Sequence, residues 1–189
     1  MAIKRLDKLL ADMGIASRSE LKNIIKSGRV TVDGKAVTIP DAKFDSELCD
    51  IALDGKSLNV QRFRYYMMDK PAGVLSVTED RKQQTVLDLL PEEQRRMGLF
   101  PVGRLDKDTS GLIILTNDGK FSDSLMNPNS HVEKEYIVKV KYPISEKFIN
   151  DLEKPIILRG KETLSAKVKK IDEYTFNIII SEGKYHQIR

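Results

Sequence analysis

The sequence predicts an α+β protein with a small N-terminal domain, residues 1–60, and a larger domain, residues 61–189. Two short helical patterns followed by short alternating strands occupy the first sixty residues. After residue 64, strand-like apolar runs are interrupted by a few helical patterns. Because strands and helices do not alternate strictly, we expect a mixed, mainly antiparallel β-sheet with flanking helices rather than βαβ units.

Two helices are predicted at the start of the small domain. The first is indicated by apolar residues at helical spacing, which are Leu6, Leu9, Leu10 and Met13. Gly14 is well placed to end it. Ser17 or Ser19 can cap a second helix, which Gly28 ends. Its inward-facing residues are expected to be Leu21, Ile24 and Ile25.

Short strands follow the two helices. Residues 29–32 alternate as a strand, Asp33 and Gly34 form a tight turn, and residues 35–38 return. A second strand and turn, residues 51–56, comes after a loop that contains Pro40. These segments predict a small set of hairpins packed on the two helices.

A linker over residues 57–64 is predicted to lead into the larger domain. Residues 65–68 form a predicted strand that ends at the breaker cluster of residues 69–73. Further strands are predicted at residues 73–77, 112–116, 136–140, 166–171 and 176–180. Helices are predicted at residues 85–90, 120–126 and 145–152.

Composition is typical of a soluble globular protein, with 40% hydrophobic and 32% charged residues in a chain of 189. The single cysteine, Cys49, excludes an internal disulfide framework and fits a reducing compartment. The charged N-terminus lacks the apolar core of a signal peptide, and no apolar run approaches the roughly 18 residues of a membrane span. We therefore expect a cytoplasmic protein with no membrane partner.

Positive charge is concentrated at the front of the chain. The whole chain has a net charge of +4, but residues 1–35 hold eight Lys/Arg against four Asp/Glu, and residues 36–60 hold two against five. Arg18, Lys22 and Lys26 recur at four-residue spacing and so line one face of the second helix. Such a face suits a phosphate backbone, although a charge stripe alone is also typical of a solvated helix surface.

Three stretches of the small domain are more specific than charge. They are residues 4–10 (KRLDKLL), 17–18 (SR) and 25–35 (IKSGRVTVDGK). Together they closely resemble the S4 RNA-binding domain, over roughly residues 2–60. The resemblance implies RNA as a partner but no particular activity. We expect the RNA-contacting residues to be Arg5, Arg18, Lys22, Lys26 and Arg29.

An acidic loop, residues 103–112 (GRLDKDTSGL), is the most informative stretch of the larger domain. Two glycines brace it, and the apolar run behind it is a predicted buried strand. This arrangement can hold a carboxylate rigidly at the mouth of a pocket. The loop also matches the first half of a calcium-binding loop from Asp106 to Gly111. Asn117 stands where that loop requires a bidentate Glu, which argues against calcium.

Residues 106–109 (DKDT) also fit the D-x-D-x-T pattern of phosphatases that form an aspartyl-phosphate. That chemistry requires an apolar strand running into the first aspartate. Here Pro101, Gly103 and Arg104 interrupt the approach, and no further carboxylates for a magnesium site are evident. A turn carboxylate that caps the neighbouring backbone is the structural alternative.

Several separate stretches agree on another interpretation. They are residues 70–73 (KPAG), 103–106 (GRLD), 109–112 (TSGL), 134–136 (KEY) and 182–189 (EGKYHQIR). In this order they resemble the signature of the RNA pseudouridine synthases. The tail is most similar to the branch that acts on small-subunit (16S) ribosomal RNA. A 23S rRNA enzyme of the same family and a non-catalytic S4-type rRNA-binding or ribosome-assembly protein are the alternatives.

The resemblance implies a role for each motif. Asp106 is expected to be the catalytic carboxylate and Arg189 its counter-charge, while Tyr136 stacks on a flipped base. Arg104 is expected to contact a phosphate or fill the gap left by that base, and Lys70 to bind the RNA backbone. The reaction implies no cofactor and no metal, and we expect a monomer acting on ribosomal RNA.

Family members continue beyond the last motif with a further helix and strands. The sequence stops at Arg189, inside that motif. We therefore expect it to be truncated at the C-terminus.

Overall fold

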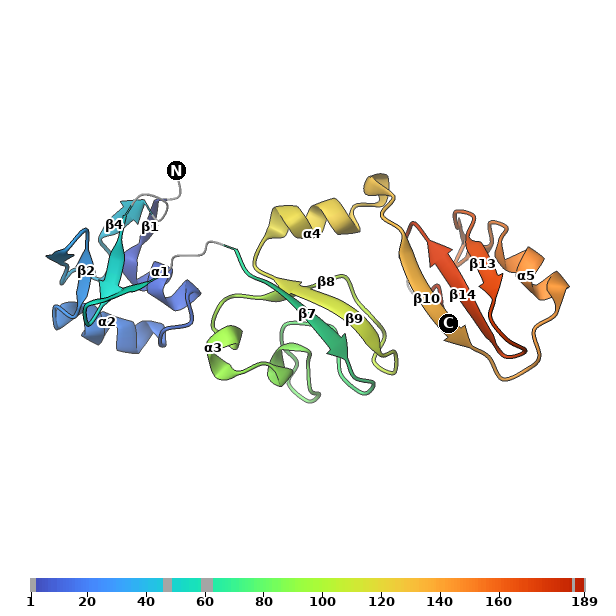
Figure 1. Cartoon of the computed structure of the whole chain (residues 1–189), viewed down its shortest axis with the longest axis horizontal. Coiled ribbons are helices and arrows are strands. Elements are labelled where there is room, and N and C mark those ends of the chain that lie inside the picture. The colour runs from blue at the N-terminus through green and yellow to red at the C-terminus, as the bar shows by residue number, and fades with distance from the viewer. Residues whose placement is uncertain (1–2, 46–48, 59–62, 185, 189) are drawn as a thin grey trace. The chain divides into compact units, whose positions relative to one another are not determined.

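The computed structural model describes residues 3–45, 49–58, 63–184 and 186–188. The chain divides into two compact units, Met1–Gly119 and Lys120–Arg189. Buried apolar side chains form two clusters in the first unit and one in the second. The α+β class is confirmed, because the strand ladders formed by the described residues are antiparallel and helices flank the sheets (Figure 1). The boundary at residue 60 stays a prediction.

The first sixty residues form two helices and six short strands among the described residues. In chain order these are β1 (Ile3–Arg5), α1 (Leu6–Asp12), α2 (Arg18–Lys26), β2 (Val30–Val32), β3 (Lys35–Ala36), β4 (Lys43–Asp45), β5 (Ile51–Leu53) and β6 (Lys56–Leu58). The strands make a four-stranded sheet of order β3-β2-β5-β6 and a separate β1-β4 pair. The apolar faces of α1 and α2 pack with β2 and β5 in one cluster.

Both predicted helices of this region are confirmed, and Ser17 rather than Ser19 caps the second. The Glu20 amide donates to the Ser17 hydroxyl at 3.4 Å, and the Ser17 amide donates to the Glu20 carboxylate at 2.9 Å. This reciprocal capping box fixes the start of α2. Leu21 and Ile25 are fully buried on its inner face.

Two tight hairpin turns connect the strands. Asp33 and Gly34 have φ of 49° and 76°, and the corresponding values for Asp54 and Gly55 are 50° and 76°. Both central residues of each turn lie in the left-handed region, as a type I′ hairpin turn requires. The turn predicted at residues 33–34 is therefore confirmed, whereas the returning strand β3 is two residues shorter than predicted.

The rest of the first unit is a three-stranded sheet with two short helical segments. Its elements are β7 (Tyr65–Lys70), a 3₁₀ turn (Leu87–Leu89), α3 (Glu92–Arg95), β8 (Phe100–Val102) and β9 (Gly111–Thr116). The strand order is β7-β9-β8 (Figure 1). One face of the sheet packs Tyr66, Met68, Ile113 and Leu115 into the second cluster.

The structure corrects several predictions in this region. Residues 73–77 form no strand, because Gly73 has φ of 92° and Leu75 makes only an isolated bridge with Thr85. The helix predicted at residues 85–90 is only a 3₁₀ turn. Strand β6 continues to Leu58, so the linker predicted from residue 57 begins too early, and residues 59–62 lie outside the described part.

The second unit is a smaller sheet covered by one helix. Its elements, starting at the junction of the units, are α4 (Gly119–Met126), a 3₁₀ turn (Pro128–Ser130), β10 (Lys134–Lys139), α5 (Glu146–Leu152), β11 (Ile157–Leu158), β12 (Lys161–Glu162), β13 (Lys167–Lys170) and β14 (Thr175–Ile180). The strand order is β10-β14-β13, and β11 and β12 form a separate hairpin. Ile149 and Leu152 of α5 pack against the cluster built on β14. The helices and strands predicted here are confirmed to within two residues, and the β11–β12 hairpin was not predicted.

Candidate functional site

The acidic loop connects β8 to β9. Gly103 and Gly111 stand at its two ends with φ of 81° and 133°, a range that side chains with a Cβ rarely adopt. Within the loop, the Thr109 amide donates to the Asp106 carbonyl at 3.0 Å. Asp106 is half-buried and Arg104 is exposed. The predicted arrangement of two glycines around the loop, with a strand directly behind it, is confirmed.

Lys70, the last residue of β7, lies beneath this loop. Its side chain is fully buried, and its ammonium group donates to backbone carbonyls of Pro71 (3.1 Å), Asp106 (3.1 Å), Lys107 (3.2 Å) and Thr109 (2.7 Å). An ammonium carries three N–H donors, so these four acceptors use its full capacity. This burial contradicts the prediction that Lys70 contacts the RNA backbone. The ammonium group is enclosed by the protein and donates its hydrogen bonds to the loop that carries Asp106.

Two opposing effects act on the pKa of the Lys70 ammonium. Burial lowers the pKa of the Lys70 ammonium below its ordinary value, whereas the negative charges of Asp108 and Asp106 raise it. Removing a charge from water is costly unless it is paired or hydrogen-bonded. The carbonyls and the two carboxylates supply that compensation here, so Lys70 joins the core of the unit to the acidic loop.

The segment after Lys70 makes further contacts with the same loop. The Gly73 amide donates to the Lys107 carbonyl at 2.6 Å. The Ser76 hydroxyl donates to the Leu105 carbonyl at 2.8 Å and accepts from the Leu105 amide at 3.2 Å. Ser76 is buried, and no sequence pattern singles it out. The motifs at residues 70–73 and 103–112 therefore form one hydrogen-bonded assembly.

The remaining predicted catalytic residues, Tyr136 and Arg189, belong to the second unit. Tyr136 is in β10, opposite Ile178 of β14, and its half-buried ring packs against the third apolar cluster. Arg189 lies outside the described residues. Their proposed roles toward a substrate stay predictions.

The tail that precedes Arg189 is held by Glu182. Its carboxylate accepts from the Leu164 amide at 3.0 Å and from the Gln187 side-chain amide at 2.8 Å, and it pairs with the Lys184 ammonium. Burial alone would raise the pKa of Glu182, but these donors and the Lys184 charge lower it below its ordinary value. Glu182 is therefore an ionised anchor of the last motif.

All five predicted RNA-contacting residues of the small domain are exposed. Lys22 and Lys26 are exposed on α2, whereas Leu21 and Ile25 are buried. Arg29 forms a two-point ion pair with Asp54 at 2.8 and 2.6 Å, so part of its charge is already compensated.

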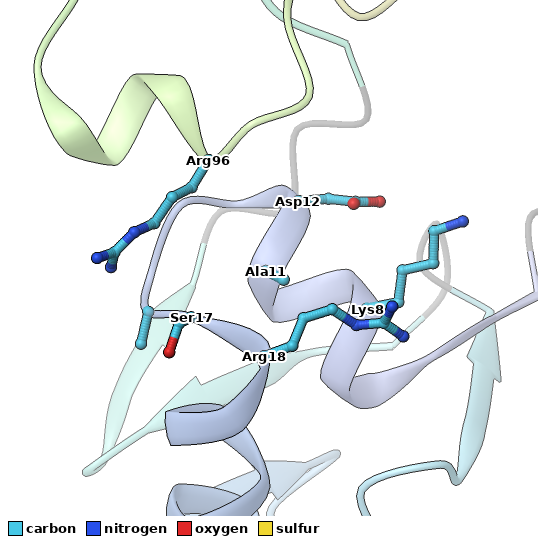
Figure 2. A pocket seen from close by; sticks show the side chains of 7 residues that line it. Lys8, Ala11, Asp12, Ser17, Arg18 and Arg96 are labelled. Carbon is cyan, nitrogen blue, oxygen red and sulfur yellow. The ribbon is translucent and has the colours of Figure 1, made fainter. Parts of the chain in front are cut away.

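A pocket borders the start of α2. Lys8, Ala11 and Asp12 of α1 line it together with Arg18. Figure 2 shows the long side chains of Lys8 and Arg18 extended from their helices. Lys8 is exposed, and sequence reasoning did not single it out although it lies on the same surface as the predicted contacts.

Two features of other classes of protein are absent from the described residues. No group of three or more His, Cys, Asp or Glu side chains is arranged to hold a metal ion within residues 3–45, 49–58, 63–184 and 186–188. Over the same ranges, the structure contains no helix of the length and apolar character that a bilayer crossing requires.

Comparison with known proteins decides the family. A family model described as RNA pseudouridylate synthase matches residues 64–189, and a model of the S4 domain matches residues 4–47. This chain belongs to the RNA pseudouridine synthase family. Its members are isomerases that modify RNA, and the S4 domain binds RNA, so both resemblances seen in the sequence are confirmed.

Relatives match nearly the whole chain. The uncharacterized RNA pseudouridine synthase YtzG of Bacillus subtilis is 43% identical over 98% of this chain and 80% of its own length. The ribosomal large subunit pseudouridine synthase B of the same species is 36% identical, over 99% and 78%. The dual-specificity RNA pseudouridine synthase RluF of Escherichia coli is 34% identical, over 98% and 63%.

A solved structure supports the fold as well. A crystal structure described as a pseudouridylate synthase superposes with a TM-score of 0.63 at 32% sequence identity. The match covers 98% of this chain and 80% of that one. The structural likeness therefore extends over the residues matched by the S4 model as well as those matched by the synthase model.

Proposed function

We propose that this chain isomerises a specific uridine of ribosomal RNA to pseudouridine, with 16S rRNA as the first candidate substrate and Asp106 as the catalytic carboxylate. The observation that carries the proposal is the acidic loop, whose backbone Lys70 binds through the carbonyls of Asp106, Lys107 and Thr109. In a chain of this family, that loop offers a carboxylate held at a fixed position.

The reaction breaks the bond from C1′ to N1 of the uridine, turns the base, and joins C1′ to C5. The hydrogen on C5 leaves as a proton, and N1 takes up a proton, so the atoms balance. No electrons are gained or lost and no water is added. The chemistry needs one ionised carboxylate at the sugar, which either attacks C1′ or removes a sugar proton. Asp106 is the proposed group for either route.

Lys70 is the proposed positioning residue for Asp106. A catalytic group that must meet a reacting atom gains from being held in place before the substrate arrives. The ammonium binds the carbonyls of Asp106, Lys107 and Thr109, so the Asp106 backbone has little freedom to move. Ser76 adds a second attachment through Leu105. Both groups act through the loop and do not touch the substrate.

The other roles follow the family resemblance. Tyr136 stacks on the flipped base, Arg189 compensates the charge of Asp106, and Arg104 contacts a phosphate or fills the vacated space. Residues 1–60 act as the RNA-binding domain and residues 61–189 as the catalytic domain. The backbone of the RNA is held by exposed cations of the first of these, which are Arg5, Arg18, Lys22, Lys26 and Arg29.

Two observations favour different ribosomal subunits. The tail at residues 182–187 is most similar to the 16S branch, and this makes 16S rRNA the first candidate. Two of the matched relatives are named for the large subunit and for dual specificity, which makes 23S rRNA the second candidate. Both candidates require the same chemistry at Asp106.

Mapping of pseudouridine in total rRNA tests this function. Cells with and without the gene are compared, and the deletion strain is complemented with the wild-type gene or with Asp106→Asn. We expect one position of 16S rRNA to lose its pseudouridine in the deletion strain and to regain it only with the wild-type gene. A lost position in 23S rRNA would select the second candidate, and unchanged maps of both rRNAs would contradict the proposal.

A further inference from the structure

Asp7 is a fully buried carboxylate in the first turn of α1. Arg5 donates to it from two atoms, Nε at 3.0 Å and Nη2 at 2.8 Å, in a two-point pair. The Nη2 atom of Arg18 lies 3.8 Å from the same carboxylate. One buried anion therefore lies between two guanidinium groups that come from different elements, Arg5 at the end of β1 and Arg18 at the start of α2.

The charge of this carboxylate is well supported. Burial alone would raise the pKa of Asp7, but the hydrogen bond and charge of Arg5, the Lys8 amide and the charge of Arg18 lower it below its ordinary value. Asp7 is therefore ionised at neutral pH. Because its backbone amide is bound to the Pro40 carbonyl at 2.9 Å, the carboxylate is also fixed in position.

Both arginines keep donors for a second anion. A guanidinium has five N–H groups, and Arg5 uses one on each of two nitrogens for Asp7. The side chains of Arg5 and Arg18 are 43% and 60% exposed, whereas that of Asp7 is 0% exposed. The Asp7 carboxylate is thus inaccessible to RNA, whereas the side chains of Arg5 and Arg18 face solvent. Together Arg5, Arg18 and Asp7 carry a net charge of +1. The buried Asp7 carboxylate orients the two exposed guanidinium groups.

We infer that Asp7 is a positioning residue that fixes Arg5 and Arg18 as a two-point clamp for phosphate groups of the RNA backbone. The inference rests on the proposed RNA-binding function of residues 1–60 and adds a residue to it. Planar guanidinium groups bind phosphate with directed N–H donors. Both their charge and their orientation therefore affect the affinity for phosphate.

Charge alone predicts the opposite effect of removing Asp7. Loss of a carboxylate makes the surface more positive, which strengthens binding to a polyanion and steepens its salt dependence. Loss of a positioning group frees two side chains and removes ordered phosphate contacts, which weakens binding and flattens the salt dependence. The sign of the change therefore separates the two explanations.

The test measures binding of the full chain to 16S rRNA transcribed in vitro, at a series of salt concentrations. For Asp7→Asn we expect affinity to fall about tenfold, with the log–log salt slope reduced by about one to two. Asp12→Asn is the matched control, because Asp12 lies on the same helix and pairs with the half-buried Lys4 at 2.8 Å. The control should bind as well as wild type or more tightly.

A second variant covers the case in which Asp7→Asn does not fold. Arg5→Lys keeps the charge but loses the planar fork, and its exposed site tolerates the change. We expect weaker RNA binding from a chain that still folds, with a thermal unfolding temperature lowered by roughly a few degrees because the buried Asp7 loses one of its two hydrogen bonds from residue 5. Wild-type affinity in Arg5→Lys, or binding by folded Asp7→Asn that is as tight as in Asp12→Asn, would overturn the inference. If the wild-type chain does not bind 16S or 23S rRNA, the proposed function fails as well.

Discussion

Two charged side chains, Lys70 and Asp7, are fully buried in the described part of the first unit, and each is matched by groups of opposite polarity. A buried charge without partners destabilises a protein by several kcal/mol. The carbonyls around Lys70 and the guanidinium groups around Asp7 provide those partners. In both cases the interior charge orients a surface element, either the acidic loop or the arginine pair.

Replacement of Lys70 tests its positioning role. Lys70→Met keeps nearly the length of the side chain but leaves three loop carbonyls and the Pro71 carbonyl without their donor, at a cost of about 1–3 kcal/mol for each acceptor that stays buried and unpaired. We expect kcat/KM to fall at least about tenfold through kcat, because Asp106 loses its fixed position. RNA affinity should stay near wild type, because Lys70 is not exposed.

Lys107→Met is the control for this variant. Lys107 lies in the same loop, but its side chain is exposed. Measurements of turnover, RNA affinity and thermal unfolding in the two variants separate the effects of Lys70 on catalysis, on RNA binding and on stability. A loss of RNA affinity in Lys70→Met as large as its loss of turnover would restore Lys70 as an RNA contact.

The position of Lys70 could have been predicted from the sequence, whereas that of Ser76 could not. Tyr66, Met68 and Lys70 alternate along β7, so Lys70 falls on the core face once the strand is extended by two residues. Because breaker residues follow, the predicted strand ended at residue 68, two residues before the end of β7. Ser76 contacts Leu105 across 29 positions of sequence, and no local pattern reports such a pair.

At the scale of elements, the sequence predicted those that carry a strong local signal. The helices α1, α2, α4 and α5 and the strands β9 and β14 have apolar periodicity, caps or long apolar runs. The missed strands have two or three residues, too few for a clear alternation, and β1 in addition depends on the distant strand β4. Pro101 was interpreted as a break, but it fits within β8 because β8 is an edge strand.

The exposed cations of α2 allow a prediction about this element. Replacement of Arg18, Lys22 and Lys26 together by Gln should weaken RNA binding and lower the log–log salt slope by about one for each phosphate group that the variant no longer binds. The helix should survive, because its capping box and its buried Leu21 and Ile25 are unchanged.

The control for this triple variant replaces three exposed lysines of the second unit, Lys147, Lys154 and Lys161, with Gln. Both variants lose the same charge, so a larger change in slope for the α2 variant identifies a contact surface. Equal slopes for the two variants, or a slope unchanged from wild type, would mean that α2 presents only a solvated face.

At the scale of the whole molecule, the sequence predicted the α+β class and the family because several motifs occur in order over nearly the full chain. Each motif consists of residues that are neighbours in the sequence, so each can be recognised without the structure. Compactness depends on contacts between distant residues, and the units that the structure defines meet at residue 119. We propose that residues 1–60 and 61–189 divide RNA binding and catalysis between them, and separate expression of the two segments tests this by folding and RNA-binding measurements.

The central claim is that Asp106 performs the isomerisation. Bond formation at C5 expels the hydrogen there, so rRNA that carries tritium at C5 of its uridines reports turnover as released tritium. Asp108→Asn is the matched control, because it removes the same charge from an exposed position of the same loop. We expect Asp106→Asn to lower the rate by roughly a thousandfold or more, at nearly unchanged RNA affinity, while Asp108→Asn keeps most of the activity. Turnover of Asp106→Asn within a few-fold of wild type would contradict the claim.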